Sequence, residues 1–281
     1  MVDRLEALLE HFPVSARIEE ACRVRATLQL DAAPGAGHLL LFRQGGATLA
    51  QDGSDPVRID AASLVLLPRP GAARIDIDAV GEETVVELDV VRAWLHFEGG
   101  TASPIAGAMP MAVVLPLDGL HGASPVPGLV FDEAFDGRCG RRAMLDRLLD
   151  VLLVQALRTL MEGGQIQVGL LAGMGHARLR HALVAMHEQP HLEWTLEALA
   201  ERAGMSRSVF AASFRDTIGV TPGQYLQGWR TRLVQQALRR GHPLKRIAVD
   251  VGYGSEAALS RAFKAQIGQS PRQWRQALAA S

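Results

Sequence analysis

The chain has few of the features that mark secreted, disulfide-linked or membrane-spanning proteins. Its 281 residues include two cysteines, Cys22 and Cys139, too few for a disulfide framework and too far apart in sequence for a zinc motif. No apolar run approaches the roughly 18–20 residues that a membrane-spanning helix needs. The acidic, amphipathic start of the chain lacks the basic residues and the continuous apolar stretch of a signal peptide. We therefore expect a cytoplasmic protein that has no membrane partner.

Net charge is also nearly absent, at −1, but it is unevenly distributed along the chain. Residues 190–281 contain 13 Arg or Lys and 6 Asp or Glu, so this part carries +7 and the remainder carries −8. A basic segment attached to an acidic one is typical of a nucleic-acid-binding module joined to a second module. With 48% hydrophobic residues, the chain can build the cores of two ordinary domains.

Between about residues 22 and 117, short runs rich in Val, Leu and Ile alternate with clusters of Gly, Pro and Asp. Gly45-Gly46 and Asp52-Gly53 are turn signals between such runs. Several short strands at this spacing predict an antiparallel sandwich or barrel. A further strand is expected in the run that begins at Glu83, and a short helix is expected over Val2–Phe12.

Helices are predicted after the strands. Arg141–Glu162 has leucines at helical spacing over a face broader than one contact surface requires, and Gly163-Gly164 ends it. This face either packs within the chain or binds a second subunit, and both alternatives stay open here. A second helix is expected from His176 to His187. We place a sensory domain with a helical appendage at residues 1–170 and a second domain at residues 171–281.

The last third of the chain contains two copies of one pattern, about 49 residues apart: Thr195 to Gly219 and Pro243 to Gly268. We align Gly204-Met205-Ser206 of the first copy with Tyr253-Gly254-Ser255 of the second. Each copy predicts a short amphipathic helix, a glycine-containing turn and a second helix capped by serine. Such an arrangement is typical of a helix-turn-helix unit, whose second helix enters the major groove of DNA.

Outward positions near the start of each second helix would meet base edges in that arrangement. Val209, Phe210 and Phe214 are expected to point inward, as is Leu196 of the preceding helix. Arg261 can donate a bidentate pair to guanine, and Glu256 can accept from cytosine N4. The residues predicted to face DNA are Ser206, Arg207, Ser208, Ala211 and Ala212 in the first copy, and Ser255, Glu256, Ala257, Ser260 and Arg261 in the second.

A spacer helix is predicted between the copies, with Thr221 as its cap, Pro222 at its first position and Gly241 after its end. Some 19 residues make a rod of roughly 28 Å, close to the ~34 Å of one DNA turn. A tandem pair on a spacer helix is far more specific than a single unit. The basic residues around it should be a mixture of phosphate contacts and solvated side chains: Arg230, Arg232, Arg239, Arg240, Lys245 and Arg246.

These motifs resemble the AraC family of bacterial transcription regulators. GYGSEAALSRAFKAQIGQSPRQWR, from Gly252, matches the C-terminal signature of that family, and LAERAGMSRSVFAASFRDTIGVTPGQYLQGWR, from Leu199, is similar to its first motif. The resemblance covers about 90 residues and implies an all-helical domain with two helix-turn-helix units. GHLLLFRQGGATL, from Gly37, and LVLLPRPG, from Leu64, resemble the cupin-type sensory domain of one AraC subgroup, in which helices that can dimerise follow the barrel.

The resemblance implies an α+β chain, with an N-terminal antiparallel β-barrel and a C-terminal all-α domain. We expect a sequence-specific regulator, acting as an activator, that binds double-stranded promoter DNA and senses a small molecule or an oxidant. A homodimer and RNA polymerase are its expected partners. No cofactor or metal is expected, because His38 has no HxH nearby and residues 71–74 supply no histidine.

Two other classes of function remain as alternatives. A metal-dependent cupin enzyme with a helical accessory domain would bind metal and turn over a substrate. An interaction protein would use its two helical units to bind another protein. The +7 charge of residues 190–281 and the outward Arg207 and Arg261 argue against the interaction protein.

Cys22 and Cys139 are candidates for redox sensing, because some relatives of the subgroup resemble oxidant sensors. A sensing thiol needs a lowered pKa and access to solvent. Three arginines flank Cys139, whereas Cys22 has both arginines and glutamates beside it. Two inert thiols are the alternative. His38 and His96 lie on expected strands and are read as core or surface residues, and Trp194, Trp229 and Trp274 as core residues.

Overall fold

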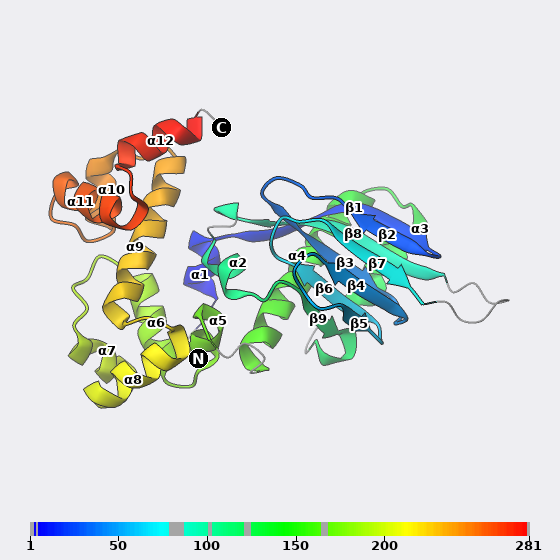
Figure 1. The fold of residues 1–281 in the computed structure, drawn as a ribbon, viewed down its shortest axis with the longest axis horizontal. Helices are drawn as coiled ribbons and strands as arrows, with labels where there is room; N and C mark the ends of the chain where they lie inside the picture. Colours follow the sequence, from blue (N-terminus) through cyan, green and yellow to red (C-terminus); the bar gives the residue numbers. More distant parts are fainter. Residues whose placement is uncertain are drawn as a thin grey trace. The chain divides into compact units, whose positions relative to one another are not determined.

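The computed structural model describes residues 3, 5–78, 87–100, 103–120, 125–163 and 168–279 (Figure 1). The chain forms two compact units: residues 12–166 form one, and residues 1–11 join residues 167–281 in the other. The expected domain limits, 1–170 and 171–281, stay a prediction. The two units are defined by contacts between residues, and such contacts do not show which segment folds independently. Val2, Gly164 and the start of the strand expected from Glu83 lie outside the described residues.

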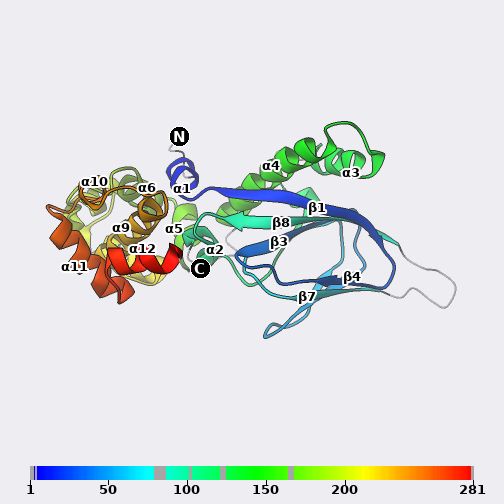
Figure 2. The same cartoon turned by 90° about the horizontal axis from the view of Figure 1, so that it is seen from above.

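Two antiparallel sheets build the unit of residues 12–166, as the strand spacing predicts. The first has the order β1-β8-β3-β6-β9, and the second has the order β2-β7-β4-β5. Figure 2 shows them as two facing layers. The strands are β1 (Val14–Val24), β2 (Thr27–Leu30), β3 (Ala36–Phe42), β4 (Ala47–Gln51), β5 (Val57–Ile59), β6 (Ser63–Leu67), β7 (Ala73–Ile77), β8 (Leu88–Phe97) and β9 (Val113–Pro116).

The core between the sheets is made by alternate residues of their strands. Leu40 and Phe42 of β3 pack with Leu49 of β4 and with Val90 of β8, and all are buried. β1 begins at Val14, earlier than the expected start near residue 22. The short helices α2 (Pro104–Ala108) and α3 (Val126–Asp136) were not expected, since their Pro and Gly residues read as turns.

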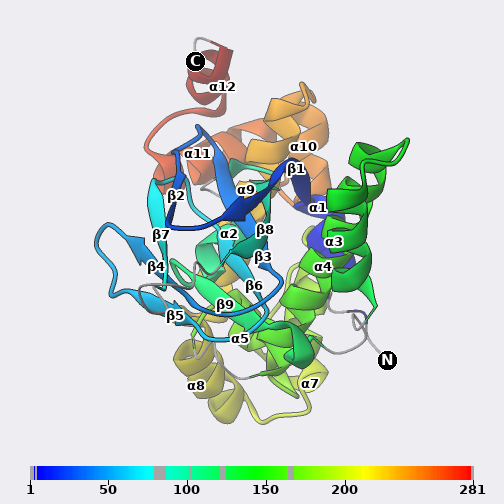
Figure 3. The ribbon, with the colours of Figure 1, turned by 90° about the vertical axis from the view of Figure 1, so that its right-hand side faces the viewer.

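Helix α4 (Arg141–Glu162) forms where the sequence predicts it, beside α3 and along the outer edge of β1 (Figures 2 and 3). The carboxylates of Asp146 and Asp150 accept hydrogen bonds from the backbone N–H groups of Ile18 and Ala16, both at 2.8 Å. Four residues of an α-helix rise about 6 Å, and two residues of a β-strand span about 6.6 Å. The spacing from Asp146 to Asp150 along α4 therefore matches the spacing from Ile18 to Ala16 along β1. These hydrogen bonds satisfy backbone N–H groups at a sheet edge that would otherwise be open to another strand.

Helices alone make up the described part of the other unit. Gly173 of α5 lies so close to Ile218 and Leu183 that an added Cβ would clash with both side chains. The second expected helix begins at Leu179 and not at His176, because the ring Nδ1 of His176 accepts hydrogen bonds from the N–H groups of Arg178 and Leu179. The helices are α1 (Glu6–His11), α5 (Leu170–Gly175), α6 (Leu179–Glu188), α7 (Leu196–Arg202), α8 (Arg207–Ile218), α9 (Pro222–Arg239), α10 (Leu244–Asp250), α11 (Glu256–Ile267) and α12 (Pro271–Ala279).

A buried aromatic stack joins α6, α8 and α9. The ring of His187 stacks on Trp229 with their centroids 3.9 Å apart, and its Nε2 lies 2.6 Å from the hydroxyl of Tyr225. Phe214 meets Tyr225 edge to face at 5.7 Å. Burial, reinforced by the nearby charges of His11 and Arg232, lowers the pKa of His187 to about 3. His187 is therefore neutral in the folded protein at ordinary pH.

The stability of this unit should depend on pH through His187. The pKa of the imidazole is 6.5 when it is unperturbed and about 3 in the folded state, so the unfolded chain takes up the proton first as pH falls. Stability is therefore full above pH 6.5 and is lost toward pH 3, by up to ~1.4 kcal/mol per pH unit.

Urea unfolding of the full chain at several pH values between 7 and 4 measures this slope. The double variant His187→Phe/Tyr225→Phe keeps the rings but cannot take up the proton, so its free energy of unfolding should change less with pH. A slope equal to that of the unaltered protein would show that His187 is not the group responsible.

Candidate nucleic-acid interface

The two sequence copies fold as two helix-turn-helix units, α7–α8 and α10–α11, which have turns of different length. Met205 N–H donates to the Ala200 carbonyl in the first unit, and Tyr253 N–H donates to the Ala248 carbonyl in the second. Gly204 and Gly252 are the left-handed residues of the two turns, with φ of 62° and 80°. The second turn therefore has one more residue before its cap, and the ungapped alignment of the turns was wrong.

Serine caps begin both second helices, as predicted. The Ser206 hydroxyl accepts from the Val209 N–H at 3.5 Å, and the Ser255 hydroxyl accepts from the Ala258 N–H at 3.1 Å. Capping holds the first turn of each helix in place, so that its outward side chains project from a defined backbone. A contact of either serine with DNA stays a prediction.

The exposure of the remaining predicted DNA-facing residues fits an outward face. Six are exposed and two, Ala211 and Ser260, are half-buried; the exposed residues are Arg207, Ser208, Ala212, Glu256, Ala257 and Arg261. Two expected core residues are not buried, because Val209 is 51% exposed and Leu196 is 38% exposed. The core stripe of α8 passes through Phe210, Phe214 and Ile218, which leaves Val209 at the edge of that stripe.

Arg207 is held by an acid of the preceding helix. Its guanidinium donates to Glu197 at 2.6 Å, and this hydrogen bond lowers the pKa of the Glu197 carboxyl. Both side chains are exposed, so the pair contributes little to stability. The position of Glu197 is taken by Lys245 in the second unit, and Arg261 has no ion pair among the described residues. The two units therefore present their arginines differently.

The comparisons with known proteins agree with this geometry. A cupin family model matches residues 3–162, and a helix-turn-helix domain model matches residues 199–277. An AraC-like transcription regulator of Streptomyces antibioticus is 34% identical over 83% of this chain and 84% of its own. The chain belongs to the AraC family of transcription regulators.

Two further proteins with names of transcription factors are similar to this chain. The RCS-specific transcriptional activator RclR of Escherichia coli K12 is 28% identical over 98% of both chains. A solved DNA-binding domain of AdpA, a global transcriptional factor in complex with a target DNA, is 32% identical. That match covers 37% of this chain and 96% of that domain, with a TM-score of 0.35.

The chain is thus a DNA-binding transcription regulator of the AraC family. No group of three His, Cys, Asp or Glu side chains in the described ranges is arranged to hold a metal ion. None of the helices seen there is both long and apolar enough to cross a bilayer.

Some basic residues of the AraC-type domain have structural roles. Arg230 donates to the carbonyls of Pro190 and Leu192 at 2.7 and 2.8 Å, which ties the loop before α7 to α9. The guanidinium of Arg239 lies over the Trp274 ring. Arg230 therefore acts as a brace between the loop and α9, a role that was not expected for it. Phosphate contacts by the other basic residues stay a prediction.

Of the two cysteines, Cys139 is exposed and Cys22 is half-buried on β1. Burial raises the pKa of the Cys22 thiol, and the charge of Glu20 adds to this effect. A sensing thiol needs the opposite shift, so its surroundings favour an inert Cys22.

A buried polar cluster lies between the sheets, and the sequence indicated only part of it. His38 of β3 is 1% exposed and pairs with Trp94 of the neighbouring strand β8. The centroids of the two rings lie 4.9 Å apart. Arg92 of β8 is 9% exposed and is paired with Glu19 and Glu20 of β1. His38 Nε2 and Arg92 Nε have no hydrogen-bond partner among the described residues. The signal for this cluster in the sequence is an arginine, Arg92, inside the apolar run VVRAWLHF, and it was missed.

Removal of the Glu197 charge should strengthen DNA binding. The variant Glu197→Gln frees Arg207 and removes a negative charge near the phosphates, so we expect a two- to tenfold lower Kd for operator DNA. Fluorescence anisotropy with labelled DNA at fixed salt measures the change. Glu201→Gln removes the same charge from the same helix without touching Arg207, and an equal gain in that control would show a general charge effect.

Proposed function

We propose that this regulator reads two adjacent major-groove segments of promoter DNA with α8 and α11. The arrangement that supports this is the pair of capped helices with exposed first turns, joined by α9. Helix α9 spans 18 residues, about 27 Å, and begins with a capping box between Thr221 and Gln224. The contacts would come from Ser206, Arg207, Ser208, Ala211 and Ala212 on one side and Ser255, Glu256, Ala257, Ser260 and Arg261 on the other.

The two half-sites should differ in how strongly they discriminate bases. Arg261 is free of an ion pair among the described residues and can reach guanine, and Glu256 at the start of the same helix can accept from cytosine. The first unit presents Arg207, which is engaged with Glu197, and two alanines that make no base-specific hydrogen bonds. The second half-site then carries most of the sequence information, whereas the first depends more on phosphates and DNA shape.

The sensed signal, in this proposal, is a small molecule that binds beside His38 and Arg92. Buried polar atoms without partners cost roughly 1–3 kcal/mol each. A ligand that hydrogen-bonds to His38 Nε2 and Arg92 Nε would offset that cost. Oxidant sensing is the second candidate, supported by the exposed Cys139 and by the name of the RCS-specific relative RclR.

A homodimer formed through α3 and α4 is part of the same proposal. The buried side of α4 packs within the unit, but Met144, Leu148 and Val151 form a stripe on its other side, at helical spacing. Met144 is 52% and Val151 45% exposed, and Leu129 of α3 is 52% exposed. Signal binding would then change how the paired DNA-binding domains engage a promoter and recruit RNA polymerase in the cytoplasm.

Substitution of Arg261 should weaken specific binding selectively. Arg261→Ala should cost roughly 1–3 kcal/mol on the promoter sequence and less on unrelated DNA, if the side chain reads guanine. Gel-shift titration on the upstream region of its own gene at about 150 mM salt measures both. Arg240→Ala, at an exposed position outside the reading helices, should weaken both DNAs equally. An equal loss for Arg261→Ala would make Arg261 a phosphate contact.

Base-pair exchange in a mapped operator tests the unequal half-sites. Exchanges under α11 should cost roughly 1–3 kcal/mol each, and those under α8 less. Equal sensitivity in both halves would contradict the assignment.

Charge placed on the α4 stripe should separate the subunits. Met144→Glu and Val151→Glu put a charge on an apolar contact, so light scattering at micromolar concentration should report a monomer where the unaltered protein is a dimer. Gln29→Glu, at an exposed position on β2 of the other sheet, is the control and should remain dimeric. Equal masses for all variants would place the dimer contact elsewhere.

Ligand sensing can be followed through Arg92. Compounds that raise the thermal midpoint of the unaltered protein should lose that effect in Arg92→Leu, because the buried guanidinium is their anchor. A cysteine-free variant that no longer responds to oxidant, while Arg92→Leu still does, would instead support the oxidant signal.

A further inference from the structure

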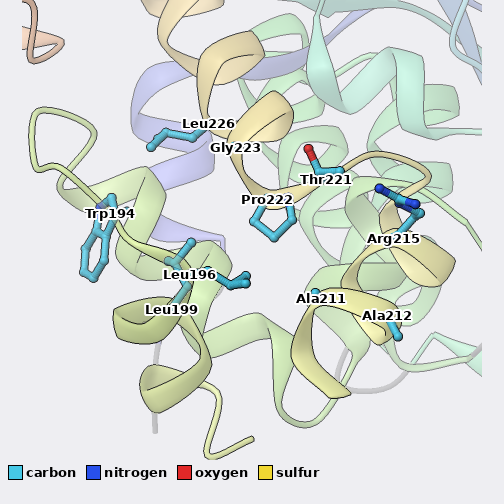
Figure 4. Close-up of a pocket in the computed structure, with 10 residues that line it drawn as sticks. All are labelled: Trp194, Leu196, Leu199, Ala211, Ala212, Arg215, Thr221, Pro222, Gly223 and Leu226. Carbon is cyan, nitrogen blue, oxygen red and sulfur yellow. The ribbon is translucent and has the colours of Figure 1, made fainter. Parts of the chain in front are cut away.

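A cavity of about 490 Å³ lies within the first helix-turn-helix unit, between α7, α8 and the start of α9 (Figure 4). Its volume is in the range of pockets that hold small molecules, roughly 300–1,000 Å³. Most of its wall is apolar. The exposed Leu196, which the sequence placed in the core, is part of this wall, so its exposure is toward a cavity.

The cavity has an apolar side and a cationic side. Trp194, Leu196 and Leu226 lie on one side, and Arg215 lies on the other, near Thr221 (Figure 4). Arg215 is exposed and has no ion pair among the described residues. Its charge is therefore available to an anion in the cavity.

The first turn of α9 adds a backbone donor on the cationic side. Pro222 has no N–H, and the Gln224 N–H is bonded to the Thr221 hydroxyl, so the Gly223 N–H is the first-turn donor left over. A Cβ on Gly223 would meet nothing within 4 Å, so the space in front of this residue is open. The positive end of the 18-residue helix also favours an anion here.

The second unit lacks the same surface, although its backbone repeats the first. When the starts of corresponding helices are aligned, Trp194 corresponds to His242, Ala212 to Arg261, Gly223 to Arg272 and Leu226 to Arg275. Apolar or small residues around the cavity of the first unit are thus replaced by four basic or polar ones in the second. If the cavity were a general feature of the helix-turn-helix fold, its wall would be apolar in both units. The apolar wall is therefore a feature of the first unit.

We propose that this cavity binds an apolar carboxylic acid of medium chain length. The carboxylate lies at Arg215 and the start of α9, and the hydrocarbon packs against Trp194, Leu196 and Leu226. A neutral or cationic amphiphile would leave the Arg215 charge without its partner, so the acid is favoured over both.

Binding of such an acid would oppose reading of the first half-site, a consequence that rests on the proposed DNA-binding function. Ala211 and Ala212 line the cavity and also belong to the face of α8 assigned to DNA. The acid and the DNA phosphates would share Arg215 as a cation. The small side chains of Ala211 and Ala212 therefore leave the cavity open, but they cannot form hydrogen bonds to bases.

Calorimetric titration of the full chain with octanoate, without DNA, tests the cavity directly. We expect saturable binding below about 1 mM, and at least tenfold weaker binding of 1-octanol and octylammonium. Arg215→Gln should weaken octanoate about tenfold and leave 1-octanol unchanged. No octanoate binding up to about 5 mM, or equal binding of the acid and the alcohol, overturns the proposal.

A filled cavity provides the matched control. Ala211→Leu should abolish octanoate binding, whereas Ser260→Leu, the corresponding position of α11, should leave it unchanged, with circular dichroism confirming that both variants fold. If Ala211→Leu binds octanoate as tightly as the unaltered protein does, octanoate binds at another site. This outcome would also overturn the assignment to the cavity. Because these titrations contain no DNA, a failure of the proposed DNA reading would leave their outcome unaffected.

A separate competition with operator DNA tests the coupling. Octanoate should raise the Kd for operator DNA in the unaltered protein but not in Leu196→Trp, a variant that fills the cavity from α7 and alters none of the residues assigned to DNA. An unchanged Kd at saturating octanoate overturns the coupling.

Discussion

Burial of one face of α9 is the constraint on which the DNA-binding unit depends. Tyr225 and Trp229 of this helix pack against α6 and α8, and the helix also contacts α10, α11 and α12. Neither short helix-turn-helix unit has enough apolar surface to be stable alone, since helices of this length are marginal without packing. One rigid helix therefore supports both reading helices, and its capping box, proline start and glycine end set its length.

The same backbone pattern supports two different surfaces. Both units have a serine cap, a left-handed glycine in the turn and a phenylalanine core. Their exposed residues differ in charge and size, because the solvent-facing positions are not constrained by the core. The first unit has an arginine held by Glu197 and a cavity behind its alanines, and the second has arginines facing outward. In our proposals, the first unit responds to a ligand and the second discriminates bases.

Several features follow from local sequence and could be predicted. Capping residues at Ser206, Thr221 and Ser255 were correctly placed, because an N-cap depends only on the residues of the first turn. The limits of α4 and the antiparallel sheets also followed, since each has strong periodicity. The positions of Leu196 and Val209 did not, because whether an apolar residue at the edge of a stripe is buried depends on what packs there.

By itself, the sequence determined the two helix-turn-helix units, their spacer helix and their family, because helix signals and caps act over a few residues. Only the tertiary structure decided which residues share a site. It brings Asp146 and Asp150 to the edge of β1, buries Arg92 beside His38, and encloses the cavity between Trp194 and Arg215. Such contacts join residues distant in the chain, and their existence depends on how whole elements pack, which no local pattern encodes.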